Sequence, residues 1–224
     1  MLSPKVRIVD DNESVRASES FSLSVAGFET VAYESAEEFL KQDDFSRPGC
    51  LLLDVRMEGM SGLELQLRLK SMGVELPILF ISGHADLNMA VGALKKGAVD
   101  FLEKPVPAEK LIHAVEKLVK HSIAECARKE ERSRKRALFD TLTPKEQEIA
   151  KLVAQDKLNK VIAFDLNITE HTVKLHRGNL YKKLGVRTVT ELYLFLRGIE
   201  EIDPVTEEPS FLHQSWLLSE DASA

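Results

Sequence analysis

The sequence predicts two folded units of different class, an N-terminal α/β unit with a doubly wound parallel sheet and a C-terminal all-α unit. In the first half, five short apolar runs alternate with amphipathic helical patterns, which is typical of a parallel sheet covered by helices on both faces. From residue 141 the pattern is helical and rich in capping residues. A length of 224 residues allows two small domains.

The strands and helices of the first half follow from apolar periodicity and capping signals. The strands are expected at about 6–9, 28–33, 50–53, 78–81 and 99–102. The helices are expected to begin near Asn12, at Ser35 and at Ser61, and later to cover about 87–96 and 108–121. Ser35 and Ser61 each precede a glutamate by three residues, which predicts capping boxes in which the hydroxyl accepts a free N–H and the glutamate reaches back.

A charged stretch, residues 124–136, follows the first half and has no apolar periodicity, so it is either an extension of the preceding helix or a linker. Beyond it, Thr143, Thr169 and Thr188 each stand where an N-cap would begin a helix. With a short helix at about 159–166, this half has four helices joined by tight turns, which is typical of a helix-turn-helix unit.

Charge is distributed unevenly along the chain. Residues 1–122 hold 14 basic and 19 acidic side chains, residues 123–200 hold 16 and 11, and residues 201–224 hold none and 6. The net charge of −6 therefore conceals a basic segment between two acidic ones. Such asymmetry favours a nucleic-acid partner for the basic segment.

The composition excludes several classes of protein. No apolar run reaches the ~18 residues of a membrane-spanning helix, and the first residues lack the apolar core of a signal peptide. Two cysteines, Cys50 and Cys126, are too few for a disulfide framework or a four-ligand zinc site. We therefore expect a reduced, cytoplasmic compartment and no membrane partner.

Polar side chains follow four of the predicted strands, at the sheet edge where ligands bind in open α/β folds. Asp10 and Asp11 follow the first strand, Asp54 the third, Ser82 the fourth and Lys104 the fifth. A single acid after a strand is most simply explained as a turn-forming residue. Five polar residues at the ends of four strands favour a shared site instead. Clustered carboxylates suit Mg²⁺, and Lys104 and Ser82 would donate to phosphoryl oxygens.

Five motifs occur together in order and spacing: Val9-Asp10-Asp11-Asn12, Leu53-Asp54-Val55-Arg56-Met57, Gly59-Met60-Ser61-Gly62, Ile81-Ser82-Gly83-His84 and Ala98-Val99-Asp100-Phe101-Leu102-Glu103-Lys104-Pro105. In these motifs residues 1–122 closely resemble the receiver domain of two-component response regulators, which has a flavodoxin-like fold.

The resemblance implies a role for each residue at the predicted edge. Asp54 would accept a phosphoryl group from a phosphohistidine of a partner histidine kinase. Mg²⁺ would be held by Asp10, Asp11, Asp54 and the backbone carbonyl of Arg56. Ser82 and Phe101 would form a switch pair, Lys104 would sense the phosphate, and the Lys104–Pro105 bond would be cis.

One position departs from the receiver pattern. Many relatives carry proline where this chain has Glu58. A carboxylate four residues after Asp54 either alters Mg²⁺ affinity or phosphoryl lifetime, or simply faces solvent.

The C-terminal half carries its own set of motifs: Leu142-Thr143-Pro144-Lys145-Glu146, Asn159-Lys160-Val161-Ile162-Ala163, residues 168–177 and Lys182-Lys183-Leu184-Gly185-Val186. In these, residues 141–200 resemble the helix-turn-helix domain of LuxR/FixJ-type (NarL/FixJ) regulators. The resemblance and the basic charge predict binding to double-stranded DNA. The candidate contacts are Asn159, Lys160, His171, Thr172, Lys174, Leu175, His176, Arg177, Lys182 and Lys183.

Helical spacing divides the residues of the predicted recognition helix between two faces. Positions 171, 174, 175 and 178 form the outward stripe, whereas Val173, Leu180 and Leu184 face the core. Relatives usually carry a longer side chain than Gly178, so DNA reading here depends more on Lys174 and Arg177 or on DNA shape. The basic pair near the helix end is either a solvated face or a DNA contact, and we expect both roles.

These features predict a receiver at 1–122, a helical linker at 123–140, a DNA-binding domain at 141–200 and an acidic tail at 201–224. Because one helix-turn-helix reads half a site, we expect phosphorylation to promote a homodimer through the face formed by the fourth helix, fifth strand and fifth helix. The tail is either a disordered end or a segment that folds onto the basic domain or the receiver and competes with DNA.

Three rival functions differ in what they require. A magnesium-dependent phosphatase of the well-known hydrolase type needs Asp-x-Asp on the first strand, whereas Asp10 and Asp11 are adjacent. A small-molecule-sensing regulator needs an apolar cavity, and a phosphorylation-independent regulator would carry a vestigial site. We expect a phosphorylation-activated transcription regulator that is not a dedicated enzyme, with at most slow loss of its own phosphoryl group.

Overall fold

The computed structural model describes residues 3–83 and 100–200, and for Glu200 only the backbone. The chain forms two compact units, residues 1–128 and 129–224. The helix predicted at 87–96, the motif residues His84, Ala98 and Val99, and the acidic tail lie outside the described residues. No helix in the described ranges is both long and apolar enough to cross a membrane.

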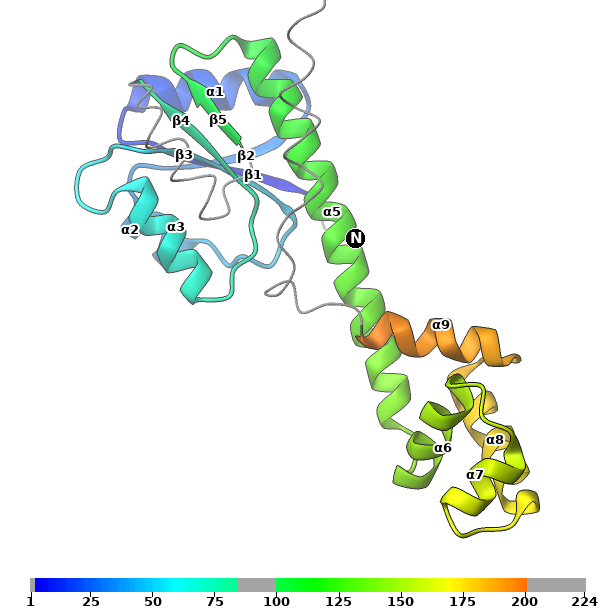
Figure 1. The fold of residues 1–224 in the computed structure, drawn as a ribbon. Helices are drawn as coiled ribbons and strands as arrows, with labels where there is room; N and C mark the ends of the chain where they lie inside the picture. Colours follow the sequence, from blue (N-terminus) through cyan, green and yellow to red (C-terminus); the bar gives the residue numbers. More distant parts are fainter. Residues whose placement is uncertain (1–2, 84–99, 201–224) are drawn as a thin grey trace, which may run out of the picture. The chain divides into compact units, whose positions relative to one another are not determined.

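A five-stranded parallel sheet forms the centre of the N-terminal unit (Figure 1). Its strands are β1 Lys5–Val9, β2 Glu29–Tyr33, β3 Gly49–Asp54, β4 Ile78–Ser82 and β5 Asp100–Glu103. Their order is β2-β1-β3-β4-β5, which makes β3 the central strand. The predicted doubly wound α/β class is confirmed, and the carboxyl ends of all five strands lie at one edge.

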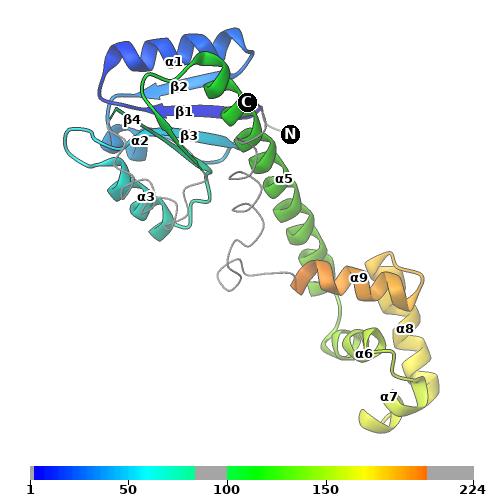
Figure 2. The ribbon, with the colours of Figure 1, turned by 45° about the horizontal axis from the view of Figure 1, so that its top comes forward.

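Helices cover both faces of this sheet, as Figures 1 and 2 show. They are α1 Glu13–Val25, α2 Ala36–Gln42, α3 Gly62–Ser71 and α5 Ala108–Asp140. Alternate residues of β3 enter different cores: Leu51 and Leu53 pack with residues of α2 and α3. Cys50 and Leu52 pack with residues of α1 and α5. The continuous apolar run of β3 is thus explained by burial on both faces.

Side chains cap the helices that surround the sheet. Asn12 accepts N–H groups of Ser14 and Val15 at the start of α1. At α3, both halves of the predicted capping box around Ser61 are formed. At α2 the prediction was half right, because Ser35 accepts from Glu38 N–H but the Glu38 carboxylate accepts from Glu34 rather than from Ser35.

Helix α5 is longer than predicted, since it continues past residue 121 to Asp140. The charged stretch has no apolar stripe, but ion pairs within the helix support it. Lys135 lies 2.9 Å from Glu131, and Arg136 lies 3.2 Å from Asp140. Such i,i+4 pairs stabilise a helix without apolar periodicity. The stretch is therefore an extension of the preceding helix, and residues 123–140 are helical as predicted.

The C-terminal unit is all helical, as predicted. Its helices after α5 are α6 Pro144–Ala154, α7 Asn159–Asp165, α8 Glu170–Leu184 and α9 Val189–Glu200. Thr143, Thr169 and Thr188 all accept N–H groups at helix starts. Gly185 ends α8 with φ of 69°, a left-handed conformation that favours glycine. These helices enclose one apolar core.

Candidate functional site

Three carboxylates meet at the carboxyl edge of the sheet. Asp10 and Asp11 follow β1, and Asp54 is the last residue of β3, the neighbouring strand. One oxygen from each lies within 4.8 Å of the others. Asp10 and Asp54 are buried, whereas Asp11 is exposed. This set of hard oxygen donors is suited to a divalent cation such as Mg²⁺.

Lys104 brings a positive charge to the same cluster from the end of β5. Its ammonium donates to Asp10 Oδ2 at 2.5 Å and to Asp54 Oδ1 at 3.1 Å. Its backbone N–H donates to the carbonyl of Ser82 at 2.9 Å, and the Lys104–Pro105 peptide is cis. The lysine therefore connects the two buried acids and the ends of β4 and β5.

The carboxylates of the cluster repel one another, because three acids share one basic side chain, Lys104. Burial raises the pKa of Asp54, Lys104 opposes that rise, and Asp10 and Asp11 add to it. Burial lowers the pKa of Lys104, but the hydrogen bond to Asp10 and the charge of Asp54 outweigh it and leave the pKa raised. A cation bound among these acids would relieve their mutual repulsion.

The other residues predicted at this edge occupy neighbouring positions. Ser82 is buried at the end of β4, beside β3. Phe101 lies in β5 opposite Phe80 of β4 and is half-buried against the core under α2 and α3. Arg56 is exposed in the loop that follows Asp54.

Glu19 is a charged neighbour that sequence reasoning missed. It lies on α1, is only 8% exposed, and its pKa is raised to about 7 by burial first and by the charge of Asp10 second. The signal was available, because Glu19 stands between Val15 and Leu23 at helical spacing on the inward stripe of α1. A carboxylate in an apolar stripe identifies a buried acid.

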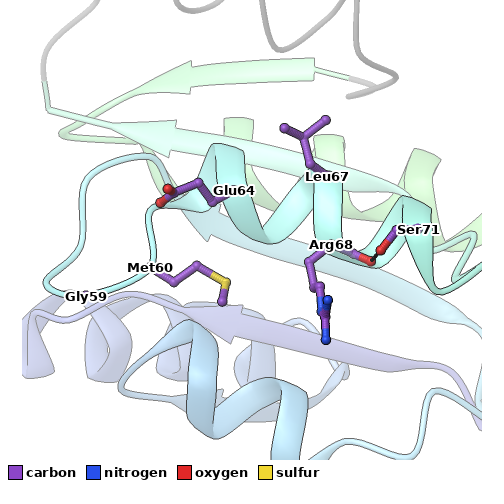
Figure 3. A pocket seen from close by; sticks show the side chains of 6 residues that line it. All are labelled: Gly59, Met60, Glu64, Leu67, Arg68 and Ser71. Atoms are coloured by element: carbon purple, nitrogen blue, oxygen red, sulfur yellow. Dashed lines mark hydrogen bonds between the residues drawn. The ribbon is translucent and has the colours of Figure 1, made fainter.

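An open hollow lies along α3 at the surface of the N-terminal unit. It has a volume of about 480 Å³ and is lined by Gly59, Met60, Glu64, Leu67, Arg68 and Ser71 (Figure 3). None of the three clustered acids lines it.

Helix α8 divides its residues as predicted. Val173 and Leu180 are fully buried and Leu184 nearly so. His171, Lys174, Leu175 and Gly178 are exposed on the other face. Helices α7 and α8 are joined by a turn in which Asn167 has φ of 51°, so the pair forms a helix-turn-helix.

Three predicted DNA contacts are engaged inside the unit. Arg177 donates to Asn159 Oδ1 at 2.5 Å and to the Tyr181 hydroxyl at 3.2 Å, which joins α7 to α8. Lys183 donates to Glu146 Oε2 at 2.7 Å and joins α8 to α6. The structure thus gives Asn159, Arg177 and Lys183 a packing role that the sequence alone did not indicate.

The remaining candidates are open to solvent to different degrees. Lys160, Lys174 and Lys182 are exposed, while Thr172 and His176 are half-buried. Together with Leu175, 58% exposed, they offer basic and apolar groups on one helix-turn-helix.

Comparisons with known proteins match both units. Residues 6–116 match the model of the response regulator receiver domain, and residues 140–196 match that of the luxR family of bacterial regulatory proteins. The chain belongs to the response regulators with a LuxR-type DNA-binding domain. The resemblance of both halves is therefore confirmed, and this response regulator is a transcription regulator in which a receiver and a DNA-binding domain share one chain.

Individual relatives cover most of the response regulator. The response regulator protein TmoT of Ectopseudomonas mendocina is 40% identical over 84% of this chain and 85% of its own. The transcriptional regulatory protein FixJ of Rhizobium meliloti is 40% identical over 84% of this chain and 92% of its own. Among solved structures, the response regulator StyR has a TM-score of 0.79 at 39% identity and covers 88% of this chain and 99% of its own.

Proposed function

We propose that Asp54 is the phosphoacceptor of this response regulator and that its phosphorylation increases sequence-specific DNA binding by the helix-turn-helix. The observation that carries the proposal is the cluster of Asp10, Asp11 and Asp54 with Lys104, at the end of the central strand. We further propose that the receiver spans 1–122, the linker 123–140, the DNA-binding domain 141–200 and the tail 201–224.

The transfer is a substitution at phosphorus. An oxygen of Asp54 forms the new bond to phosphorus, while the bond from phosphorus to the histidine nitrogen of the partner kinase breaks and leaves its electron pair on the imidazole. Lys104 neutralises part of the charge carried by Asp10 and Asp54. Mg²⁺ held by Asp10, Asp11, Asp54 and the Arg56 carbonyl would supply the remaining neutralisation of the phosphoryl oxygens.

The signal leaves the site through the ends of β4 and β5. After transfer, the Ser82 hydroxyl and Lys104 ammonium bind phosphoryl oxygens, and the movement of Ser82 opens space into which Phe101 rotates. The burial of Ser82 and the half-buried position of Phe101 on the adjacent strand support this step. The result is a changed surface for homodimer formation, in a protein that acts as a regulator rather than a dedicated enzyme.

DNA contact is assigned to the outward face of the helix-turn-helix. Lys174, Leu175 and His171 would enter the major groove, and Lys160, Thr172, His176 and Lys182 would reach flanking phosphates or base edges. Asn159, Arg177 and Lys183 act mainly by holding α6, α7 and α8 together.

Acetyl phosphate labelling tests the phosphoacceptor. Wild type and Asp54→Asn are incubated with labelled acetyl phosphate and Mg²⁺, with Asp44→Asn, a change at an exposed acid, as matched control. Label should enter the wild type and Asp44→Asn, disappear in Asp54→Asn, and fall when Mg²⁺ is chelated. Label retained by Asp54→Asn would contradict the assignment, and an unlabelled wild type would favour the phosphorylation-independent regulator.

A further inference from the structure

The loop that leaves the proposed phosphoacceptor is hydrogen-bonded to carboxylates from two other segments. This loop, residues 55–61, joins β3 to α3. The N–H of Glu58 donates to Asp11 Oδ2 at 3.1 Å. The N–H of Met60 donates to Glu37 Oε1, on α2, at 3.0 Å. Figure 3 shows Gly59 and Met60 on this loop, beside the first turn of α3.

Backbone contacts close the base of this loop, between the end of β3 and the start of α3. Gly62 N–H donates to the Val55 carbonyl at 3.1 Å, and the Ser61 capping box fixes the start of α3. A Cβ on Gly62 would lie 2.1 Å from the Asp54 carbonyl oxygen, so loop and strand pass each other closely. The loop is therefore closed at its base, and its Glu58 N–H lies within hydrogen-bond distance of Asp11.

Asp11 differs from the other two acids in how it is held. Asp10 accepts the Lys104 ammonium and, at 2.8 Å, the N–H of Asn12. Asp54 is buried and also accepts from Lys104. Asp11 is exposed, and an exposed carboxylate turns freely unless a donor orients it. The Glu58 N–H is such a donor, because it holds the Oδ2 atom of this carboxylate at 3.1 Å.

We propose that the backbone N–H of Glu58 is a positioning group that orients Asp11 toward Asp10 and Asp54 and thereby strengthens the binding of a divalent cation. This inference rests on the metal site of the proposed function. Outer hydrogen-bond partners of metal ligands typically change affinity by about 10–100-fold. Because the backbone acts, the exposed Glu58 side chain is dispensable, whereas proline, which has no N–H, removes the donor.

Three variants of the full chain separate three contributions to Mg²⁺ binding: the backbone N–H of Glu58, the charge of its side chain, and the hydrogen bond that holds the loop to Glu37. Glu58→Pro removes the N–H, Glu58→Gln keeps it and removes the charge, and Glu37→Gln weakens the parallel bond to Met60 without touching Asp11. Mg²⁺ dissociation constants are measured by isothermal titration calorimetry without any phosphoryl donor. Glu58→Pro should bind about 10-fold more weakly, and the other two should stay within about 3-fold of wild type.

The outcomes are distinguishable. Equal affinity of wild type and Glu58→Pro, or equal weakening in Glu58→Gln, would overturn the positioning role while leaving the metal site intact. A wild type that binds no Mg²⁺ would overturn the metal site and the inference together.

A second measurement decides the case if Glu58→Pro fails to fold. Hydrogen exchange at the Glu58 amide of the wild type is followed with and without Mg²⁺. Slowing by Mg²⁺ supports the role, because the metal holds Asp11 against the donor. Exchange as fast as in an unstructured peptide with Mg²⁺ present overturns it.

Discussion

Arg7 is a fully buried cation in β1, and its charge is balanced across the unit by Asp43 at the end of α2. Its Nε donates to Asp43 Oδ2 at 2.8 Å, and the Tyr33 hydroxyl donates to the same oxygen at 2.8 Å. Burial acts to raise the pKa of Asp43, but hydrogen bonds from Arg7, Phe45 and Tyr33 outweigh it and lower the pKa. Arg7 and Asp43 therefore both remain charged, and each offsets the cost of burying the other.

Removing one partner should destabilise the N-terminal unit strongly. Asp43→Ala leaves Arg7 as a buried cation without its carboxylate, at a cost of about 3–5 kcal/mol. Asp44→Ala, a change at an exposed neighbour, should cost less than about 1 kcal/mol. Hydrogen exchange of β1 and β3 amides reports the free energy of opening of this unit alone. Equal effects of the two changes would show that the buried pair contributes little.

Glu19 makes stability depend on pH in a predictable direction. Its pKa is about 7 in the folded chain against an ordinary value of 4.5. Between these values the folded chain holds a proton that the unfolded chain has lost, so stability falls as pH rises from about 4.5 to about 7. The wild type therefore carries the full penalty of a buried carboxylate above pH 7.

Glu19→Gln should remove this dependence, because glutamine has a similar size and no charge. The variant should match the wild type near pH 4 and exceed its free energy of unfolding by on the order of 3 kcal/mol at pH 8. The comparison uses hydrogen exchange of core sheet amides, corrected for intrinsic rates, at several pH values. A difference that does not change with pH would contradict a raised pKa.

At the scale of elements, α8 has a buried face that packs in the core and an exposed face that we propose for recognition. Its buried stripe enters the core, its exposed stripe carries Lys174, and two basic residues at its flanks are tied to α6 and α7. We therefore expect a basic residue on such a helix to act on DNA or on stability according to whether it has a partner within the unit. Both lysines are exposed, but Lys183 donates to Glu146, which is only 3% exposed.

Two lysine substitutions should separate these roles. Lys174→Ala should weaken DNA binding and reduce the slope of log affinity against log salt by about 1. Lys183→Ala should leave that slope nearly unchanged and lower the stability of the helical unit by about 1–2 kcal/mol, since Glu146 loses a partner. Fluorescence anisotropy over a salt series and thermal unfolding provide the two readouts. An unchanged slope in Lys174→Ala would place the DNA surface elsewhere.

At the scale of the whole molecule, the proposed switch requires two copies of the chain. A single helix-turn-helix contacts about half of a useful site, so a dimer gains both affinity and specificity. The charge distribution fits DNA binding by the C-terminal half of each copy, because basic residues are concentrated in 123–200 while the receiver segment is acidic.

Occupation of Asp54 by a phosphoryl mimic should therefore shift the mass of the protein. With beryllofluoride and Mg²⁺, the wild type should move from monomer toward dimer in multi-angle light scattering, and its affinity for a two-half-site DNA should rise. Asp54→Asn is the control and should not respond. If the mass of the wild type stays constant while DNA affinity rises, phosphorylation acts within one chain.

Local patterns were sufficient for some features because the physics that decides them is local. The Ser61 capping box and the Thr143 N-cap depend on residues three positions apart. The cluster of Asp10, Asp11 and Asp54 followed from the rule that parallel strands present their carboxyl ends at one edge. The two functional halves followed from several motifs in a consistent order.

The two fold classes, the acidic edge with Lys104 and the outward stripe of α8 could thus be predicted from the residues alone, since helix and strand periods decide which side chains share a face. The partners of Arg177, Lys183 and Asp11 could be found only in the folded chain, because they lie 18, 37 and 47 positions away. Such contacts depend on how elements pack, and no local period encodes them. The same packing placed the amide of Glu58 against Asp11.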